Sequence, residues 1–177
     1  GGGGAVCLFG MRSWLVLKKG CMALFLWLFF GLSLVSAAEV DIDKLQQGAT
    51  AGNAYDQLNL GAAYDNGIGV QRDIDKALLW YQKAAEQGVA EAQFNLAHLL
   101  VTEELSAAVA AEWMLKAAQQ GMVDAEYLMG VIYAEGIGVA SDRSAARTWL
   151  EKAIAKGHTE ASRFLKEMEK LPAASVR

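Results

Sequence analysis

The sequence predicts an all-α protein, a solenoid of antiparallel helix pairs, from three observations. First, the motif Trp-x-x-Lys-Ala-x-x-x-Gly occurs three times, starting at Trp80, Trp113 and Trp149, with spacings of 33 and 36 residues. Second, each copy follows an apolar segment with the three- and four-residue spacing of a helix. Third, 54% of the 177 residues are hydrophobic and only one is proline, so a continuous helical core can be buried. Repeats of about this length, each made of two helices, stack into solenoids.

Residues 11–37 differ from the rest of the chain and are predicted to form a secretory signal peptide. Three basic residues follow Met11 and precede an uncharged, apolar run at 22–35. Small residues follow this run, as at sites that signal peptidase cuts. Cleavage after Ala37 or after Ala38 satisfies the pattern equally well, so we expect an exported product, periplasmic or secreted.

The alternative is an uncleaved signal that anchors the protein in the inner membrane. The apolar run is shorter than the roughly 20 residues that a membrane-spanning helix requires, which favours cleavage. In this interpretation the chain meets the membrane only through the signal segment, and residues 1–10 derive from upstream translation or from cloning. Both cysteines, Cys7 and Cys21, precede the predicted cleavage site, so no disulfide is expected in the exported product.

The charge of the chain is also divided. All 20 acidic residues lie from Glu39 onward, whereas three of the 16 basic residues precede residue 38. The remainder carries 13 basic and 20 acidic side chains, a net charge of −7. Because binding to phosphate backbones requires clustered lysine and arginine, a nucleic-acid partner is not expected.

Each repeat is predicted to contain two helices, A and B, whose ends carry suitable residues. Polar residues able to cap helix B stand seven positions before each tryptophan, and glycines stand eight positions after it. The caps are Asp73, Ser106 and Asp142, and the glycines are Gly88, Gly121 and Gly157.

The turn from A to B contains Gly67 and Gly69 in the first repeat and Gly136 and Gly138 in the third. The middle repeat has lost these glycines and three residues, so its turn at 101–105 must differ. One position of helix A is always small, which allows close approach of the partner helix; it is held by Gly61, Ala97 and Gly130. The motif lysines Lys83, Lys116 and Lys152 are interpreted as the solvated edge of helix B.

Both ends of the array are predicted to be partial repeats. Residues 45–52 align with the end of a B helix, and 159–170 form a charged helix that closes the solenoid before Pro172. Residues 172–177 are expected to be a disordered tail.

The signature running from Leu60-Gly61 to Gly88 resembles the Sel1-like repeat (SLR) family, relatives of tetratricopeptide repeats. The resemblance covers repeats at about 53–88, 89–121 and 122–157 within a solenoid at 38–171. It implies a right-handed, tetratricopeptide-like α-solenoid that serves as an interaction scaffold, in bacteria often in envelope or secreted proteins.

Motifs for catalysis and cofactor binding are not found in the sequence. The glycine pairs lack the strand or the Gly-Lys-Ser/Thr of nucleotide-binding loops, and no serine lies in a hydrolase motif. His98 and His158 belong to different repeats, too far apart to share a metal. We therefore expect no catalytic residues, no metal and no cofactor. A glycan or cell-wall binding module, and less favoured a β-lactamase-like hydrolase, remain alternatives to a protein-binding scaffold.

The candidate partner surface is one stripe along the A helices, which in solenoids usually line the inner, concave face. Aromatic residues flanked by acids on this stripe suit an apolar peptide with some basic side chains, and the partner is expected to be a protein or peptide. Packing of Phe94 and Tyr127 between A helices is the alternative explanation. The predicted partner-binding residues are Tyr55, Leu58, Asp65, Glu91, Phe94, His98, Asp124 and Tyr127.

Overall fold

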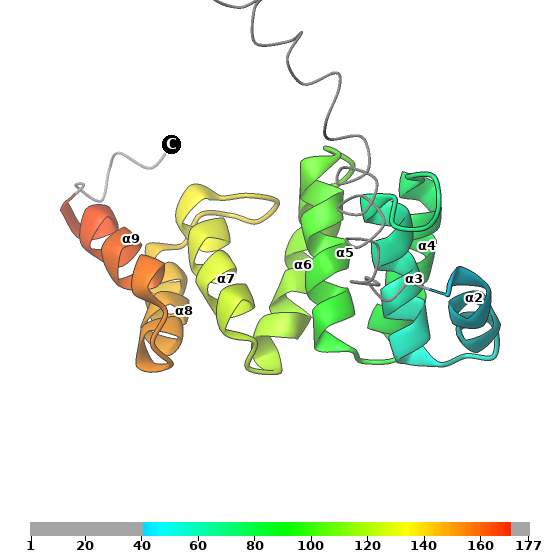
Figure 1. Cartoon of the computed structure of the whole chain (residues 1–177). Coiled ribbons are helices and arrows are strands. Elements are labelled where there is room, and N and C mark those ends of the chain that lie inside the picture. The colour runs from blue at the N-terminus through cyan, green and yellow to red at the C-terminus, as the bar shows by residue number, and fades with distance from the viewer. Residues whose placement is uncertain (1–40, 171–177) are drawn as a thin grey trace, which may run out of the picture. The chain divides into compact units, whose positions relative to one another are not determined.

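The computed structural model describes residues 41–170, so the predicted signal peptide and C-terminal tail lie outside the described residues. These residues form eight helices and no strand (Figure 1). No helix in this range is both long enough and apolar enough to cross a membrane. The helices are α2 (Ile42–Thr50), α3 (Ala54–Asn66), α4 (Ile74–Glu86), α5 (Ala90–Thr102), α6 (Ala107–Gln119), α7 (Val123–Glu135), α8 (Arg143–Ala155) and α9 (Thr159–Lys170).

The helices pack as consecutive A and B pairs, which confirms the predicted fold class. Helices α3, α5 and α7 are the A helices, and each packs most extensively against the B helix that follows it, α4, α6 or α8. Each B helix then packs against the next A helix along the chain. At the ends, α2 packs on α3 as a partial B helix, and α9 packs on α8 as a terminal A helix.

The three predicted N-caps of the B helices are confirmed. Asp73 Oδ1 accepts a hydrogen bond from the Lys76 amide at 3.1 Å, and Ser106 Oγ accepts one from the Val109 amide at 3.4 Å. Asp142 accepts from two amides in the first turn of α8. Hydrogen bonding from Lys76 lowers the pKa of Asp73 below its ordinary value, so this cap stays charged at neutral pH.

The predicted glycine positions are confirmed as well. The glycines after the B helices have φ values of 85–89°, which L side chains rarely adopt. Within the A helices, a Cβ on Gly61 would lie 2.6 Å from the Tyr81 ring, and one on Gly130 would lie 2.6 Å from Leu150 Cγ. Small residues at this position therefore let the two helices of a repeat touch.

The shortened middle turn uses a different backbone conformation. Glu104 has a φ of 53° and is the one non-glycine residue with positive φ among those described. Beside it, Glu103 Oε1 accepts a hydrogen bond of 2.8 Å from Arg72 Nη2 in the turn of the first repeat. Glu104 therefore adopts the left-handed conformation in place of the glycines, and an ion pair joins this turn to the turn of the first repeat.

The three repeated tryptophans are not buried to the same depth. Trp80 is buried, but Trp113 and Trp149 are only half-buried. The following position in each B helix is the deeper one, since Met114 and Leu150 are 3% and 0% exposed. Trp113 and Trp149 thus lie at the edge of the core, whereas Trp80 belongs to it.

The motif lysines are exposed, as expected, but each one also covers a tryptophan. The ammonium groups of Lys83, Lys116 and Lys152 lie 4.3, 3.7 and 3.9 Å from the ring centroids of the tryptophans three residues earlier. A cation this close to an indole face is attracted by the ring quadrupole. The lysine of the motif therefore shields the exposed side of the tryptophan from water.

Replacing Lys116 by methionine is expected to lower the free energy of unfolding by about 0.5–1 kcal/mol, the usual contribution of an exposed cation–π pair. Urea unfolding followed by tryptophan fluorescence measures the change. Lys166→Met, at an exposed position of α9 outside these three pairs, is the control. Equal effects of the two substitutions would contradict a specific role for the Lys116–Trp113 pair.

Candidate functional site

The candidate site is the surface of the A helices that carries the predicted partner-binding stripe, called the A face below. Four of the predicted residues are exposed on it. Tyr55 near the start of α3 is 68% exposed, and Glu91, His98 and Asp124 on α5 and α7 are exposed as well. These side chains form the accessible part of the predicted site.

Two of the predicted partner-binding residues contribute to packing within the first repeat instead. Leu58 is 4% exposed and belongs to a core cluster with Tyr81, so it is not available to a partner. Asp65 is half-buried, and its Oδ2 accepts a hydrogen bond of 3.4 Å from the Tyr81 hydroxyl. Its backbone carbonyl accepts another from Arg72 Nε at 2.8 Å. Burial, together with the charge of Asp65, raises the pKa of Tyr81 far above its ordinary value, so the hydroxyl remains a donor.

Phe94 and His98 lie one helical turn apart on α5 and are brought together. Their rings are stacked, with centroids 6.5 Å apart and an interplanar angle of 11°. Phe94 is half-buried and packs against the core, whereas His98 is exposed. The imidazole ring of His98 is therefore accessible to a partner, and the ring of Phe94 beneath it joins it to the core.

Tyr127 on α7 lies in an aromatic cluster that reaches into the last helix. Its ring stacks on His158 at 4.5 Å and meets Phe164 edge-on at 6.3 Å. His158 Nδ1 accepts a hydrogen bond from the Ala161 amide at 3.1 Å, so it caps α9. Its Nε2 lies 3.5 Å from Asp124 Oδ1.

The repeat pattern does not assign His158 and Phe164 to this surface, and from the sequence His158 is considered only as a metal ligand. The signal available was its position after Gly157 and directly before a helix, where the first repeat has the capping residue Asn53. The stacking on Tyr127 joins two A helices, and no local pattern reveals that contact. Within residues 41–170, no three histidine, cysteine, aspartate or glutamate side chains are grouped so that they could hold a metal ion.

Behind the A face, a buried amide network links successive helices. Gln57 Nε2 donates to the carbonyl of Ala49 at the end of α2, at 3.0 Å, and Gln57 Oε1 accepts from Gln87 Nε2 at 2.7 Å. The second repeat uses the same arrangement, with Gln93 joined to the Ala85 carbonyl and to Gln120. Each such glutamine therefore connects three helices.

The third repeat replaces both glutamines by charged residues. Glu126, 4% exposed, stands at the position of Gln57, and Lys156 stands at that of Gln87. Lys156 Nζ lies 2.7 Å from Glu126 Oε1 and donates to the Gly121 carbonyl at 2.9 Å. Among the described residues, Glu126 Oε2 has no hydrogen-bond partner. A carboxylate cannot donate, so the bond to the preceding B helix is missing here.

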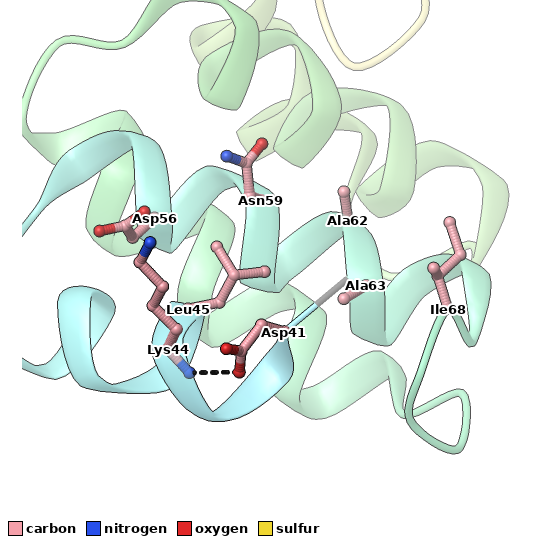
Figure 2. Close-up of a pocket in the computed structure, with 8 residues that line it drawn as sticks. All are labelled: Asp41, Lys44, Leu45, Asp56, Asn59, Ala62, Ala63 and Ile68. Atoms are coloured by element: carbon pink, nitrogen blue, oxygen red, sulfur yellow. Dashed lines mark hydrogen bonds between the residues drawn. The ribbon is translucent and has the colours of Figure 1, made fainter. Parts of the chain in front are cut away.

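A cavity of about 480 Å³ lies at the other end of the array, between α2 and α3 (Figure 2). Its volume is within the range of roughly 300–1,000 Å³ found for ligand pockets. Carboxylates, an ammonium and an amide share the lining with apolar side chains. The lining residues are Asp41, Lys44, Leu45, Asp56, Asn59, Ala62, Ala63 and Ile68.

The paired helices, the small residues between them and the lysine-covered tryptophans define an α-solenoid repeat protein. The Sel1 repeat family model matches three consecutive segments, 54–89, 90–122 and 123–158, which together cover more than half of the chain. The protein therefore belongs to the Sel1 repeat family.

Two curated relatives carry names that describe a role. Chitin synthase regulatory factor 3 of Schizosaccharomyces pombe is 33% identical over 144 residues, which are 78% of this chain and 15% of that protein. The secretory immunoglobulin A-binding protein EsiB of Escherichia coli is 35% identical over 69 residues, 38% of this chain and 14% of that protein. The chain thus spans only a small part of the length of these relatives.

Two solved structures share the fold. A Sel1 repeat protein from Oxalobacter formigenes aligns with a TM-score of 0.64 at 34% identity, covering 72% of this chain and 98% of that one. A protective antigen of uropathogenic Escherichia coli strains that displays an SLR fold aligns with a TM-score of 0.70 at 29% identity. This alignment covers 89% of this chain and 35% of the antigen.

Proposed function

We propose that the protein is an exported repeat scaffold that binds another protein or peptide through the A face and acts as an adaptor or regulator. The observation that carries the proposal is the combination of exposed acids, Glu91 and Asp124, with the exposed rings of Tyr55 and His98. Such a surface suits an apolar segment that carries basic side chains, because aromatic rings provide contact area while carboxylates select positive charge.

Relatives of the protein support a binding role. EsiB is named for binding secretory immunoglobulin A, and the Schizosaccharomyces pombe relative is named as a regulatory factor. In both, the matched segment is a small part of a longer protein. We infer that the Sel1 repeats provide the interaction surface in this chain, with a partner specified by its own A face.

The double variant Glu91→Lys, His98→Ala is expected to weaken partner binding by at least tenfold, because it reverses one charge and removes one ring on the A face. The partner is first isolated from envelope extract, and its affinity is then measured by calorimetry with purified proteins. Glu112→Lys, an equal charge change on the B helix α6, is the control and should leave affinity unchanged. Wild-type affinity of the double variant would place the binding site elsewhere.

Export is the second part of the proposal, and it depends on the basic, apolar and small-residue order of 11–38. Expression of the full chain in a bacterial host is expected to yield a periplasmic or secreted product that begins at Ala38 or Glu39. Mass spectrometry of the exported fraction reads this end directly. A species that still begins at Met11 and remains in the inner membrane would support the anchor instead.

A further inference from the structure

The cavity between α2 and α3 lies at the repeat position where, at the other end of the array, helix α9 meets helix α7. On α9, Phe164 contacts Tyr127 of α7. One repeat earlier, Leu128 of α7 and Phe94 of α5 pack against the same core cluster. The corresponding residue of α3 is Asn59, and it lines the cavity.

Among the described residues no A helix precedes α3. The one earlier helix, α2, takes the place of a B helix, because Leu45 aligns with Tyr81 and Ala49 with Ala85. Each later B helix packs against an A helix of its own repeat, whereas α2 has no such partner among the described residues. The cavity therefore lies where an A helix paired with α2 would pack.

At one position, the cavity wall has a charged residue where the later repeats have alanine. At each later junction an alanine of the B helix faces an alanine of the next A helix, as with Ala84 and Ala92. Here the corresponding pair is Gly48 and Asp56. A Cβ on Gly48 would lie 1.9 Å from Asp56 Oδ2, so the glycine makes the room that the carboxylate occupies.

The remaining lining describes the chemistry of an occupant. Leu45, Ala62 and Ile68 supply apolar surface, and Ala62 is only half-buried. The charged groups are the carboxylates of Asp41 and Asp56 and the ammonium of Lys44, a net charge of −1. A largely apolar lining with a net negative charge suits an amphipathic helix that carries basic side chains beside its apolar face.

We propose that this cavity receives an amphipathic, basic helix of the partner protein, which acts as the A helix of the partial repeat that contains α2. The inference rests on the proposed function and names the element of the partner that is recognised. The exported product proposed above retains at most residues 38–40 before Asp41, and helix α3 alone contains 13 residues. These three residues are too few to form such a helix, so we assign the helix to a partner protein.

Binding of a synthetic A-type helix to the exported protein tests the proposal. The probe is the peptide of residues 89–103, which contains α5, with Glu91 and Glu103 replaced by lysine; the unchanged peptide is its control. We expect micromolar binding of the lysine peptide by fluorescence anisotropy and at least tenfold weaker binding of the control. Equal affinities for the two peptides would overturn the charge complementarity on which the proposal depends.

Two protein variants locate the site. Ala62→Trp fills the cavity and should lower the affinity for the lysine peptide at least tenfold. Ala155→Trp, on the exposed side of α8, should leave this affinity unchanged. The pair Gly48→Ala, Asp56→Ala restores the alanines of the other junctions, so it should fold normally and lose the preference for lysine. Unchanged binding by both cavity variants would overturn the proposal, as would a wild-type dimer in sedimentation that Ala62→Trp converts to monomers, because a second copy would then fill the cavity.

The A face can be judged separately. If the cavity variants bind the natural partner with wild-type affinity while Glu91→Lys, His98→Ala does not, the helix proposal fails and the A-face proposal stands. If the cavity variants lose the partner and the A-face variant retains it, the cavity is the binding site and the A-face proposal fails.

Discussion

Replacing Gly138 by alanine is expected to destabilise the protein by about 2–5 kcal/mol. Gly138 has a φ of 69°, which costs an L residue roughly 1–2 kcal/mol, and overpacking adds typically 1–3 kcal/mol. A Cβ at this position would lie 2.2 Å from the carbonyl oxygen of Ala107, where α6 begins. Because backbone cannot rotate away as a side chain can, the turn or the start of α6 must move. Thermal unfolding should show a midpoint lower by about 10 °C or more.

Gly136→Ala in the same turn is the matched control. Gly136 has a similar φ of 73°, but a Cβ there would meet its nearest neighbour at 3.4 Å, an ordinary contact. Its expected cost is the conformational part alone, about 1–2 kcal/mol. Equal costs for the two substitutions would show that the contact between Gly138 and α6 has no energetic weight.

The second large effect is expected at the buried Glu126–Lys156 pair. Lys156→Gln should cost about 1–3 kcal/mol, because it leaves the Glu126 carboxylate buried without its cation. The value is reduced from the 3–5 kcal/mol typical of broken buried pairs because the Lys156 side chain is 41% exposed. The double variant Glu126→Gln, Lys156→Gln should recover most of this loss, because it recreates the glutamine pair of the first two repeats.

Urea unfolding of the wild type, the two single variants and the double variant measures the interaction energy of the pair. The side-chain amide introduced by Glu126→Gln would also supply the donor that the carboxylate lacks, directed to the carbonyl of Ala118, which corresponds to Ala49 and Ala85. The control pair is Lys170→Gln, Glu167→Gln, an exposed ion pair of the same 2.7 Å separation on α9. If the losses in the free energy of unfolding from the two single substitutions simply added in the double variant, a glutamine pair could not replace the Glu126–Lys156 ion pair.

Local features of the fold were predictable because they depend on short stretches of chain. A cap such as Asp73 is recognised from its distance to the repeated tryptophan, and Gly88 from its place after the helix end. Depth was not predictable in the same way. Periodicity identifies the face of a helix that packs, but the neighbouring helices decide whether Trp113 or Met114 lies deeper, and here Met114 does.

The candidate site was predicted only in part for a related reason. The helical spacing of the predicted stripe correctly indicates that Tyr55, Glu91, His98 and Asp124 are accessible. The same spacing includes Leu58, although this side chain is buried in the core of the first repeat. Contacts between helices, such as Tyr127 with His158, depend on tertiary packing that sequence spacing does not contain.

The amide network behind the A face has a consequence for how such an array grows. In each of the first two repeats the two side chains of the network come from the same unit, Gln57 with Gln87 in the first and Gln93 with Gln120 in the second. The side-chain amide of each of these glutamines donates to a main-chain carbonyl in the preceding unit, an acceptor that every residue type has. A duplicated unit therefore carries its own matched pair, and this network requires no particular side chain from the unit before it. Recombination that changes the length of the array can then leave the network intact.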